Sequence, residues 1–184
     1  MAEFDHLLEV LAVNRSHGSV GEKSLLDAVG HAEAYVSALP QSAVSLADLG
    51  SGGGLPGLVI AVRCPHLRVT LIERRSNRAD QLLRSVHALG IADRVVVCAQ
   101  DVSVVVERMP GAFDVVSARS FAAPEITARW ASALLRLGGM LIVSEPPVAS
   151  LGRWPAPMLE RYALSDLGTR GAVRCFEHVV LAPS

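Results

Sequence analysis

The chain has 184 residues and lacks features that mark several common protein classes. Lys23 is its only lysine and it has two tyrosines, so the Tyr-x-x-x-Lys pair of many nicotinamide-dependent oxidoreductases cannot be built. The three cysteines, Cys64, Cys98 and Cys175, are scattered and odd in number. They fit buried thiols in a reducing compartment, and neither a disulfide framework nor a zinc motif is expected.

Long hydrophobic runs and an excess of positive charge are also absent. No apolar run reaches membrane-spanning length, and the first residues lack the basic stretch of a signal peptide, so we expect a cytoplasmic protein without membrane association. The formal net charge is −1. A protein that grips naked nucleic acid usually has a clear basic excess, so the charge favours a small-molecule substrate or a polyanion bound on one local patch. The hydrophobic fraction of 51% supports one domain with a large core.

Strand and helix signals alternate through the middle of the chain. Strands are expected at about 44–49, 68–73, 94–98, 113–118 and 139–144, and helices at about 55–64, 76–89, 102–108 and 124–136. Gly90 and Gly138 stand where C-cap glycines belong, and Pro124 fits a first helical turn. This alternation predicts an α/β fold with a mostly parallel sheet and helices on both faces.

The two ends of the chain differ from this middle. Residues 1–40 are expected to form an N-terminal helical extension, in which Ser19 and Glu22 make a capping box that opens the second helix. Residues 41–184 are expected to form the main domain as one structural unit. Two further strands are expected near its end, at 161–165 and 172–181. No helix fits between them, so they should form an antiparallel hairpin at the edge of the sheet.

The stretch from Asp48 to Gly57 carries the strongest functional signal. An apolar strand stops at a glycine cluster, and a helical stretch follows. The Asp-x-Gly-x-Gly-x-Gly spacing is associated with S-adenosylmethionine sites, because bare amides let the backbone approach the ligand and an acid suits its ammonium. The expected cofactor contacts from this stretch are Asp48, Gly50, Ser51, Gly52, Gly54 and Pro56. The residues also satisfy the dinucleotide pattern G-x-G-x-x-G, and a plain turn without a ligand is the remaining interpretation.

Further candidates follow the next strands. Glu73 ends the second strand, where a carboxylate can accept both ribose hydroxyls of an adenosine or can cap the next helix. Gln100 and Asp101 are placed to bind an adenine amino group, although Asp101 can equally cap the following helix. Ser117, Arg119 and Phe121 leave the fourth strand, and we expect them to face the reacting methyl group. Arg119 would order the cofactor or contact a substrate phosphate or base, unless it only bonds loop carbonyls.

Other charged residues remain open to two interpretations. One predicted helix is crowded with four arginines, Arg74, Arg75, Arg78 and Arg84. They can form a patch that binds nucleic acid, or they can be the solvent-exposed face of the helix. Arg74 is also a candidate cofactor contact. Glu145 follows the fifth strand, in a turn that should bring its carboxylate near the pocket. No metal site and no Ser-His-Asp or Cys-His set is expected, and a methyl transfer needs none, because it depends mainly on alignment and exclusion of water.

The chain resembles the bacterial small-subunit ribosomal RNA guanine-N7 methyltransferases, also called glucose-inhibited division protein B. Asp48 to Gly57 is similar to that family's Asp-Val-Gly-Ser-Gly-x-Gly-x-Pro-Gly loop. Glu73 with Arg78, and the segment 117–122, resemble further family segments, so the resemblance spans roughly residues 44–144. It departs from the family where Glu145 and its neighbours replace a Leu-Lys-Gly segment.

The resemblance implies a class I S-adenosylmethionine-dependent methyltransferase with a Rossmann-like sheet and S-adenosylmethionine as cofactor. It also implies methyl transfer to guanine N7 of ribosomal RNA in the small ribosomal subunit. A methyltransferase of a small-molecule substrate is the nearest alternative, and a cofactor-binding paralogue without catalysis is another. The acidic replacement at Glu145 keeps both alternatives open.

Overall fold

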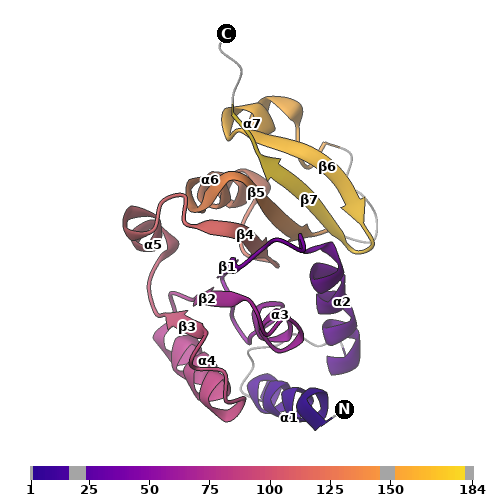
Figure 1. Cartoon of the computed structure of the whole chain (residues 1–184), viewed down its shortest axis with the longest axis vertical. Coiled ribbons are helices and arrows are strands. Elements are labelled where there is room, and N and C mark those ends of the chain that lie inside the picture. Colours follow the sequence, from indigo (N-terminus) through magenta and orange to yellow (C-terminus); the bar gives the residue numbers. More distant parts are fainter. Residues whose placement is uncertain (1, 17–23, 146–151, 181–184) are drawn as a thin grey trace.

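The computed structural model describes residues 2–16, 24–145 and 152–180, which form seven helices and seven strands (Figure 1). The strands are β1 (Ser45–Leu49), β2 (Arg68–Ile72), β3 (Val95–Cys98), β4 (Phe113–Ala118), β5 (Leu135–Ser144), β6 (Leu164–Arg170) and β7 (Val173–His178). The helices are α1 (Ala2–Ser16), α2 (Leu25–Ala38), α3 (Gly57–Arg63), α4 (Ser76–Ala88), α5 (Val102–Arg108), α6 (Pro124–Leu134) and α7 (Ala156–Arg161). None of these helices is long and apolar enough to cross a membrane.

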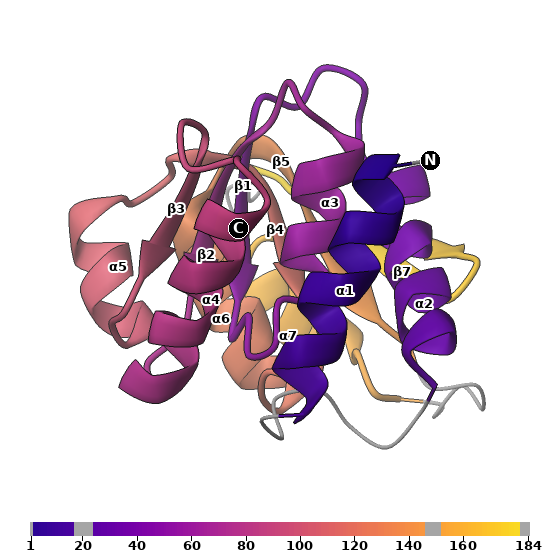
Figure 2. The same ribbon diagram turned by 90° about the horizontal axis from the view of Figure 1, so that it is seen from below.

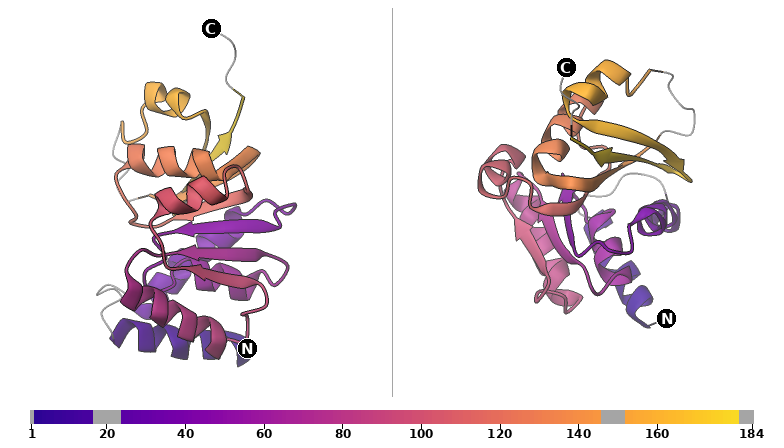
Figure 3. Two further views of the ribbon diagram at one scale, coloured as in Figure 1. Left: turned by 90° about the vertical axis from the view of Figure 1, so that its left-hand side faces the viewer. Right: turned by 45° about the horizontal axis from the view of Figure 1, so that its top comes forward.

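The strands make one sheet in the order β3-β2-β1-β4-β5-β7-β6. The first five are parallel, and β7 pairs antiparallel with both β5 and β6. The views in Figure 3 show the strands as a twisted stack that ends in this hairpin. The predicted α/β fold, parallel sheet and antiparallel edge hairpin are therefore confirmed. Because the chain builds outward from β1 and then returns to β4, the order reverses between these two strands, where open α/β sheets bind ligands.

Two apolar cores lie on the two faces of the sheet. Buried residues of α1, α2, α3 and α4 belong to one core, and buried residues of α5, α6 and α7 belong to the other. Figure 2 shows α5 separated by the sheet from α1, α2 and α3. The largely apolar content of β1 and β4 follows from this arrangement, since a central strand covered on both faces has no solvent side. All six residues of β4 are buried.

The start of β5 differs from the sequence expectation. α6 ends at Leu134 and the strand begins at the next residue, so the prediction that Gly138 is a helix C-cap was wrong. Gly138 has φ +73° inside the strand, where the pairing with β4 shifts register. At Gly139 a Cβ would stand 2.9 Å from the Arg136 carbonyl oxygen, so the irregular strand start requires glycine. Gly90 after α4, with φ +66°, and Pro124 at the first position of α6 are confirmed.

Two helix boundaries also differ. The expected capping box of Ser19 and Glu22 lies outside the described residues. Where α2 is described, Ser24 caps it by accepting a hydrogen bond from the Asp27 amide at 3.1 Å. Helix α7 was not predicted, and the strand expected from residue 161 begins at Leu164 instead. A six-residue helix is too short to show a helical apolar period in the sequence.

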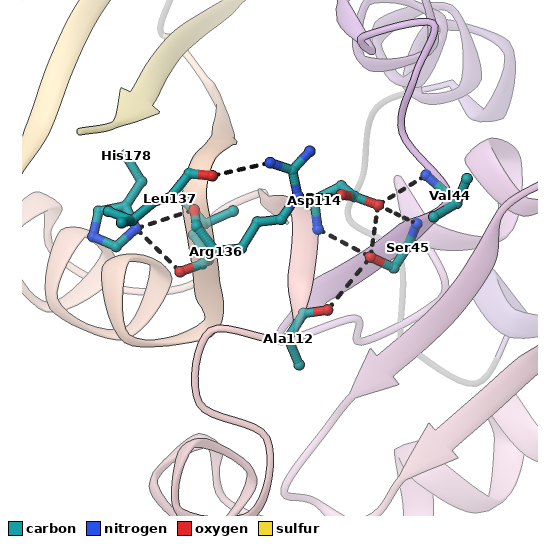
Figure 4. A network of polar contacts seen from close by, with 8 residues as sticks. Val44, Ser45, Ala112, Asp114, Arg136, Leu137 and His178 are labelled. Atoms are coloured by element: carbon teal, nitrogen blue, oxygen red, sulfur yellow. Dashed lines mark hydrogen bonds and ion pairs between the residues drawn. The ribbon is translucent and has the colours of Figure 1, made fainter. Parts of the chain in front are cut away.

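The edge of the sheet opposite the carboxyl ends of the strands is held by one carboxylate (Figure 4). Asp114, at the start of β4, accepts hydrogen bonds from the Val44 and Ser45 amides, each at 2.9 Å. Arg136 of β5 donates its Nε to the other oxygen at 2.5 Å. Burial raises the pKa of Asp114, but the bonds from Arg136, Val44 and Ser45 outweigh it and lower the pKa to about 2. Asp114 therefore fixes the amino ends of β1, β4 and β5 as a charged carboxylate.

Candidate functional site

A cavity of about 440 Å³ opens at the carboxyl ends of the parallel strands. The glycine loop after β1, the end of β2, the loop after β3, the loop after β4 and helix α6 all contribute to its wall. Its lining residues are Gly50, Ile72, Glu73, Arg74, Arg75, Arg78, Gln100, Asp101, Val102, Ser120, Phe121, Ala122, Ile126 and Trp130. Five predicted cofactor residues therefore meet in one hollow: Gly50, Glu73, Arg74, Gln100 and Asp101.

The glycine loop is shaped by three residues in the left-handed region. Gly50, Gly52 and Gly54 have φ values of +65°, +53° and +96°. A Cβ on Gly54 would lie 2.3 Å from Leu58 Cδ1, so packing against α3 requires that glycine. A Cβ on Gly52 would meet nothing closer than 3.6 Å, with the Arg78 guanidinium 3.8 Å away. A Cβ on Gly52 would therefore make only ordinary contacts, and Gly52 is not among the residues that line the cavity. Its positive φ, and not a lack of space, favours glycine at this position.

Glu73 joins the loop to the cavity. Its side chain is nearly buried, with the residue 5% exposed. Oε2 accepts a hydrogen bond from the Gly52 amide at 3.1 Å, and Oε1 accepts one from the Arg75 amide at 2.9 Å. A carboxylate has about four lone-pair positions, so these two bonds leave capacity for further donors on the cavity side. Glu73 can therefore shape the loop and accept two hydroxyl groups of a ligand.

Several predicted site residues lie beneath the loop, outside the cavity lining. Asp48 is 1% exposed, and its Oδ1 accepts a hydrogen bond from Ser117 Oγ at 2.7 Å. Burial raises the pKa of Asp48 to about 6, against the opposing effect of the Ser117 bond. Ser51 Oγ donates to the Asp48 carbonyl oxygen at 3.0 Å, and Pro56 precedes α3. Ser117, which is expected to face the reacting methyl group, is fully buried and bonds to Asp48, so these four residues lie outside the cavity lining.

The loop after β3 serves two purposes. Asp101 caps α5, because its carboxylate accepts hydrogen bonds from the Ser103 amide at 3.0 Å and hydroxyl at 2.9 Å. The amide bond, followed by the hydroxyl bond, lowers the pKa of Asp101. Gln100 lies beside it, within 3.4 Å of Arg108. Since both residues also line the cavity, the capping role and the ligand role are compatible in this geometry.

Arg119 does not line the cavity. Its Nη1 atom is buried and has no hydrogen-bond partner among the described residues. The Arg119 charge acts on Asp48 and on Tyr35 of α2, whose hydroxyl donates to the Ala118 carbonyl oxygen at 2.9 Å. Arg119 therefore lies on the α2 side of the strand ends. A buried guanidinium donor without a partner is costly, and it favours an anionic or polar group at this position.

The cavity has an apolar wall of which the sequence predicted only Phe121, and not Ile126 or Trp130. Ile126 and Trp130 lie four residues apart, so they share the face of α6 that meets the cavity. Phe121 adds to this wall and packs over the glycine loop, where a Cβ on Gly50 would come within 2.8 Å of its ring. The guanidinium of Arg129 lies 4.6 Å from the centre of the Trp130 ring. The i, i+4 spacing after the fourth strand is the signal that could have identified the wall.

The predicted arginine cluster divides into two parts. Arg74, Arg75 and Arg78 line the cavity, at the end of β2 and the start of α4. Arg84 lies further along α4, beside a separate opening between α1 and α4. The first three form a cationic rim at the cavity, which we call the arginine rim.

The structure corrects the expectation that Glu145 faces the pocket. Its side chain is 8% exposed, and its Oε1 accepts a hydrogen bond from Trp154 Nε1 at 2.8 Å. Arg153 is 3.9 Å from the same oxygen. Trp154 in turn packs against Phe176 of β7, with ring centroids 4.7 Å apart. Glu145 therefore joins the end of β5 to the C-terminal part of the chain and adds no anion to the cavity.

The fold and the cavity at its switch point define a class I methyltransferase domain. The solved structure titled "Crystal structure of cofactor-bound Rv0187 from MTB" matches with a TM-score of 0.64 at 17% identity, over 95% of this chain and 89% of that one. The mitomycin 7-O-methyltransferase MmcR matches with a TM-score of 0.64 at 20% identity, over 90% of this chain and 55% of that one. These similarities show the shared fold.

The sequence model of the family described as rRNA small subunit methyltransferase G matches residues 9–145, and the chain belongs to this family. A family relative named ribosomal RNA small subunit methyltransferase G, from Rhizorhabdus wittichii, is 51% identical over 75 residues, 41% of this chain and 33% of the relative. A relative of the same name from Mycolicibacterium gilvum is 39% identical over 138 residues, 73% of this chain and 57% of the relative. The chain spans about half the length of the curated relatives it matches.

Proposed function

We propose that this chain is an S-adenosylmethionine-dependent methyltransferase that methylates guanine N7 in the RNA of the small ribosomal subunit. The observation that carries the proposal is the cavity at the carboxyl ends of the parallel strands, bordered by the nearly buried carboxylate of Glu73. The donor set fits the cofactor, because Glu73 can accept ribose hydroxyls while Gln100 and Asp101 face the same cavity. Membership of the rRNA small subunit methyltransferase G family supports both the activity and the substrate.

The protein's part in such a reaction is to bind and to orient. When bound, S-adenosylmethionine supplies a methyl group that its sulfonium has already activated. Glu73 would hold the ribose, the glycine loop would admit the ligand close to the backbone, and Phe121, Ile126 and Trp130 would exclude water along one wall. Guanine N7 carries a lone pair and no proton. Its attack on the methyl carbon would therefore need alignment and no general base.

The arginine rim supports a polyanionic substrate. Three guanidinium groups and two carboxylates line the cavity of a chain whose net charge is −1, so the cavity carries a local excess of positive charge that would favour an approaching RNA backbone. The half-buried Arg119, with its unpaired donor, is a second candidate phosphate or base contact near the strand ends. A small neutral metabolite would gain nothing from such a rim.

Two measurements test the proposal. Calorimetry should show binding of S-adenosylmethionine with a dissociation constant in the micromolar range, about −8 kcal/mol, and no binding of NAD. Binding of NAD alone would overturn the cofactor assignment. Affinity for small-subunit ribosomal RNA should fall with added salt, and the double variant Arg74→Ala, Arg75→Ala should make the logarithmic salt slope less negative by roughly 1.5.

The matched control is Arg68→Ala. Arg68 is an exposed arginine at the amino end of β2, on the edge of the sheet away from the cavity. Removing it should leave the salt slope unchanged. The RNA affinity could instead be independent of salt and unchanged by the arginine-rim variant, in a protein that binds S-adenosylmethionine. That result would favour the small-molecule substrate.

A further inference from the structure

Asn14 connects the N-terminal helix to the glycine loop. It belongs to α1, is 1% exposed, and lies 39 residues before the loop residue it contacts. Its Nδ2 donates a hydrogen bond to the Gly53 carbonyl oxygen at 3.0 Å. Its Oδ1 lies 3.1 Å from the Ser85 hydroxyl of α4, which is also within 2.9 Å of the Gln81 carbonyl oxygen. A buried amide thus bridges α1, the glycine loop and α4.

The bridge acts on the part of the site that is richest in glycine. Glycine has more backbone freedom than any other residue, so a loop of consecutive glycines has to be held in place to bind a ligand without a large entropic cost. Two adjacent residues of the loop are held from different directions. The Gly52 amide is held by Glu73 at 3.1 Å, and the Gly53 carbonyl is held by Asn14. Leu58 of α3 packs against the next residue, Gly54.

The position of α1 is itself fixed by packing. Leu7 and Leu11 are fully buried in the core that α1 shares with α2, α3 and α4. Leu7, Leu11 and Asn14 recur at intervals of four and three residues, so they share one face of the helix. Burial of the two leucines therefore places Asn14 against the glycine loop. The apolar residues of α1 alone would stabilise the fold. The buried amide adds a directional contact whose only described loop partner is Gly53.

We infer that Asn14 is a positioning residue for cofactor binding, and that α1 is therefore a working part of the methyltransferase site. The inference rests on the proposed function. Asn14 does not line the cavity, so it acts through the peptide group of Gly53 by keeping the glycine loop in its ligand-ready conformation. Losing the tether should lower the affinity for the cofactor by roughly three- to tenfold, the effect of one buried hydrogen bond.

The test compares three variants of the full chain. Asn14→Leu keeps the approximate size and removes both polar groups. Asn14→Asp keeps an acceptor for Ser85 and removes the donor to Gly53, and it serves if the leucine variant folds poorly. Val10→Ala is the matched control, because Val10 is a buried residue of the same helix that contributes to its packing and lies one turn before Asn14. Calorimetry with S-adenosylhomocysteine, thermal unfolding without ligand, and the KM and kcat for S-adenosylmethionine are measured for each.

Both Asn14 variants should raise the dissociation constant and the cofactor KM by the same factor, with kcat within about twofold of wild type. Val10→Ala should lower the unfolding temperature and leave the dissociation constant unchanged. Wild-type affinity for S-adenosylhomocysteine in a folded Asn14 variant would overturn the role of Asn14 and leave the proposed function untouched. So would an equal loss of affinity in Val10→Ala, because it would attribute the effect to helix packing. A wild-type protein that binds neither S-adenosylmethionine nor S-adenosylhomocysteine would overturn the proposed function, and this inference with it.

Discussion

The substitution Gly52→Ala separates the ligand role of the glycine loop from its role as a turn. Gly52 has φ +53°, and a Cβ added there meets no atom closer than 3.6 Å. The cost to the free protein is therefore only the strain of an alanine in the left-handed region, about 1 kcal/mol. For a chain of 184 residues, that should lower the unfolding temperature by roughly 2–4 °C.

The effect on binding should be much larger. The new methyl group would stand where we expect the cofactor to approach the backbone of the loop. Overpacking of this kind costs roughly 1–3 kcal/mol, so affinity for S-adenosylhomocysteine should fall about 5- to 150-fold. Calorimetry on the folded variant measures this directly.

Gly90→Ala is the matched control. Gly90 follows α4 with φ +66°, and a Cβ there meets nothing within 4 Å, so the strain is the same but no cavity is involved. It should lose about as much stability as Gly52→Ala and bind the cofactor like the wild type. Gly54→Ala should instead destabilise the protein strongly, since its Cβ would stand 2.3 Å from Leu58. If Gly52→Ala and Gly90→Ala bind equally well, the loop is a plain turn and the reasoning fails.

Two further predictions concern buried carboxylates. Glu145→Lys should lower the free energy of unfolding by about 1–3 kcal/mol, because it leaves the Trp154 indole without its acceptor. Glu145→Gln keeps an acceptor and should lose less stability. Urea unfolding that is equal for the wild type and both variants would contradict this prediction. Burial raises the pKa of Asp48 to about 6 from an ordinary 3.8. The buried, protonated Asp48 therefore costs the folded state nothing below the ordinary pKa of 3.8, and the free energy of unfolding of the wild type falls as pH rises from there through about 6. Asp48→Asn should remove this loss and gain up to about 3 kcal/mol at pH 7 in thermal unfolding, and parallel pH curves for the two proteins would contradict the assignment.

Much of the fold could be predicted from the sequence because its signals are local. Alternating strand and helix periods give the parallel sheet, and strand ends in such a sheet gather at one edge. The same rule predicts that Gly50, Glu73 and Asp101 meet at one edge of the sheet, and all three line one cavity. Helix α7 was missed because six residues hold less than two turns, and the irregular start of β5 was misread as a helix cap.

The remaining features of the site depend on contacts between distant residues. The bond from Asn14 to Gly53 spans 39 positions, and no spacing rule points to it. The partner of Glu145 is Trp154, whose approach depends on how the chain returns after β5. Ser117 was expected at the surface of the site because it ends a strand. Its side chain is fully buried and contacts the buried Asp48.

The most direct test of the account is methyl transfer to intact small ribosomal subunits. Purified chain would be incubated with methyl-labelled S-adenosylmethionine and subunits at low and high salt, with Gly52→Ala as the blank. The account predicts label in the ribosomal RNA at guanine N7, a rate that falls with salt, and little label with the variant. Absence of label in the RNA, from a wild-type protein shown to bind the cofactor, would contradict the proposed substrate.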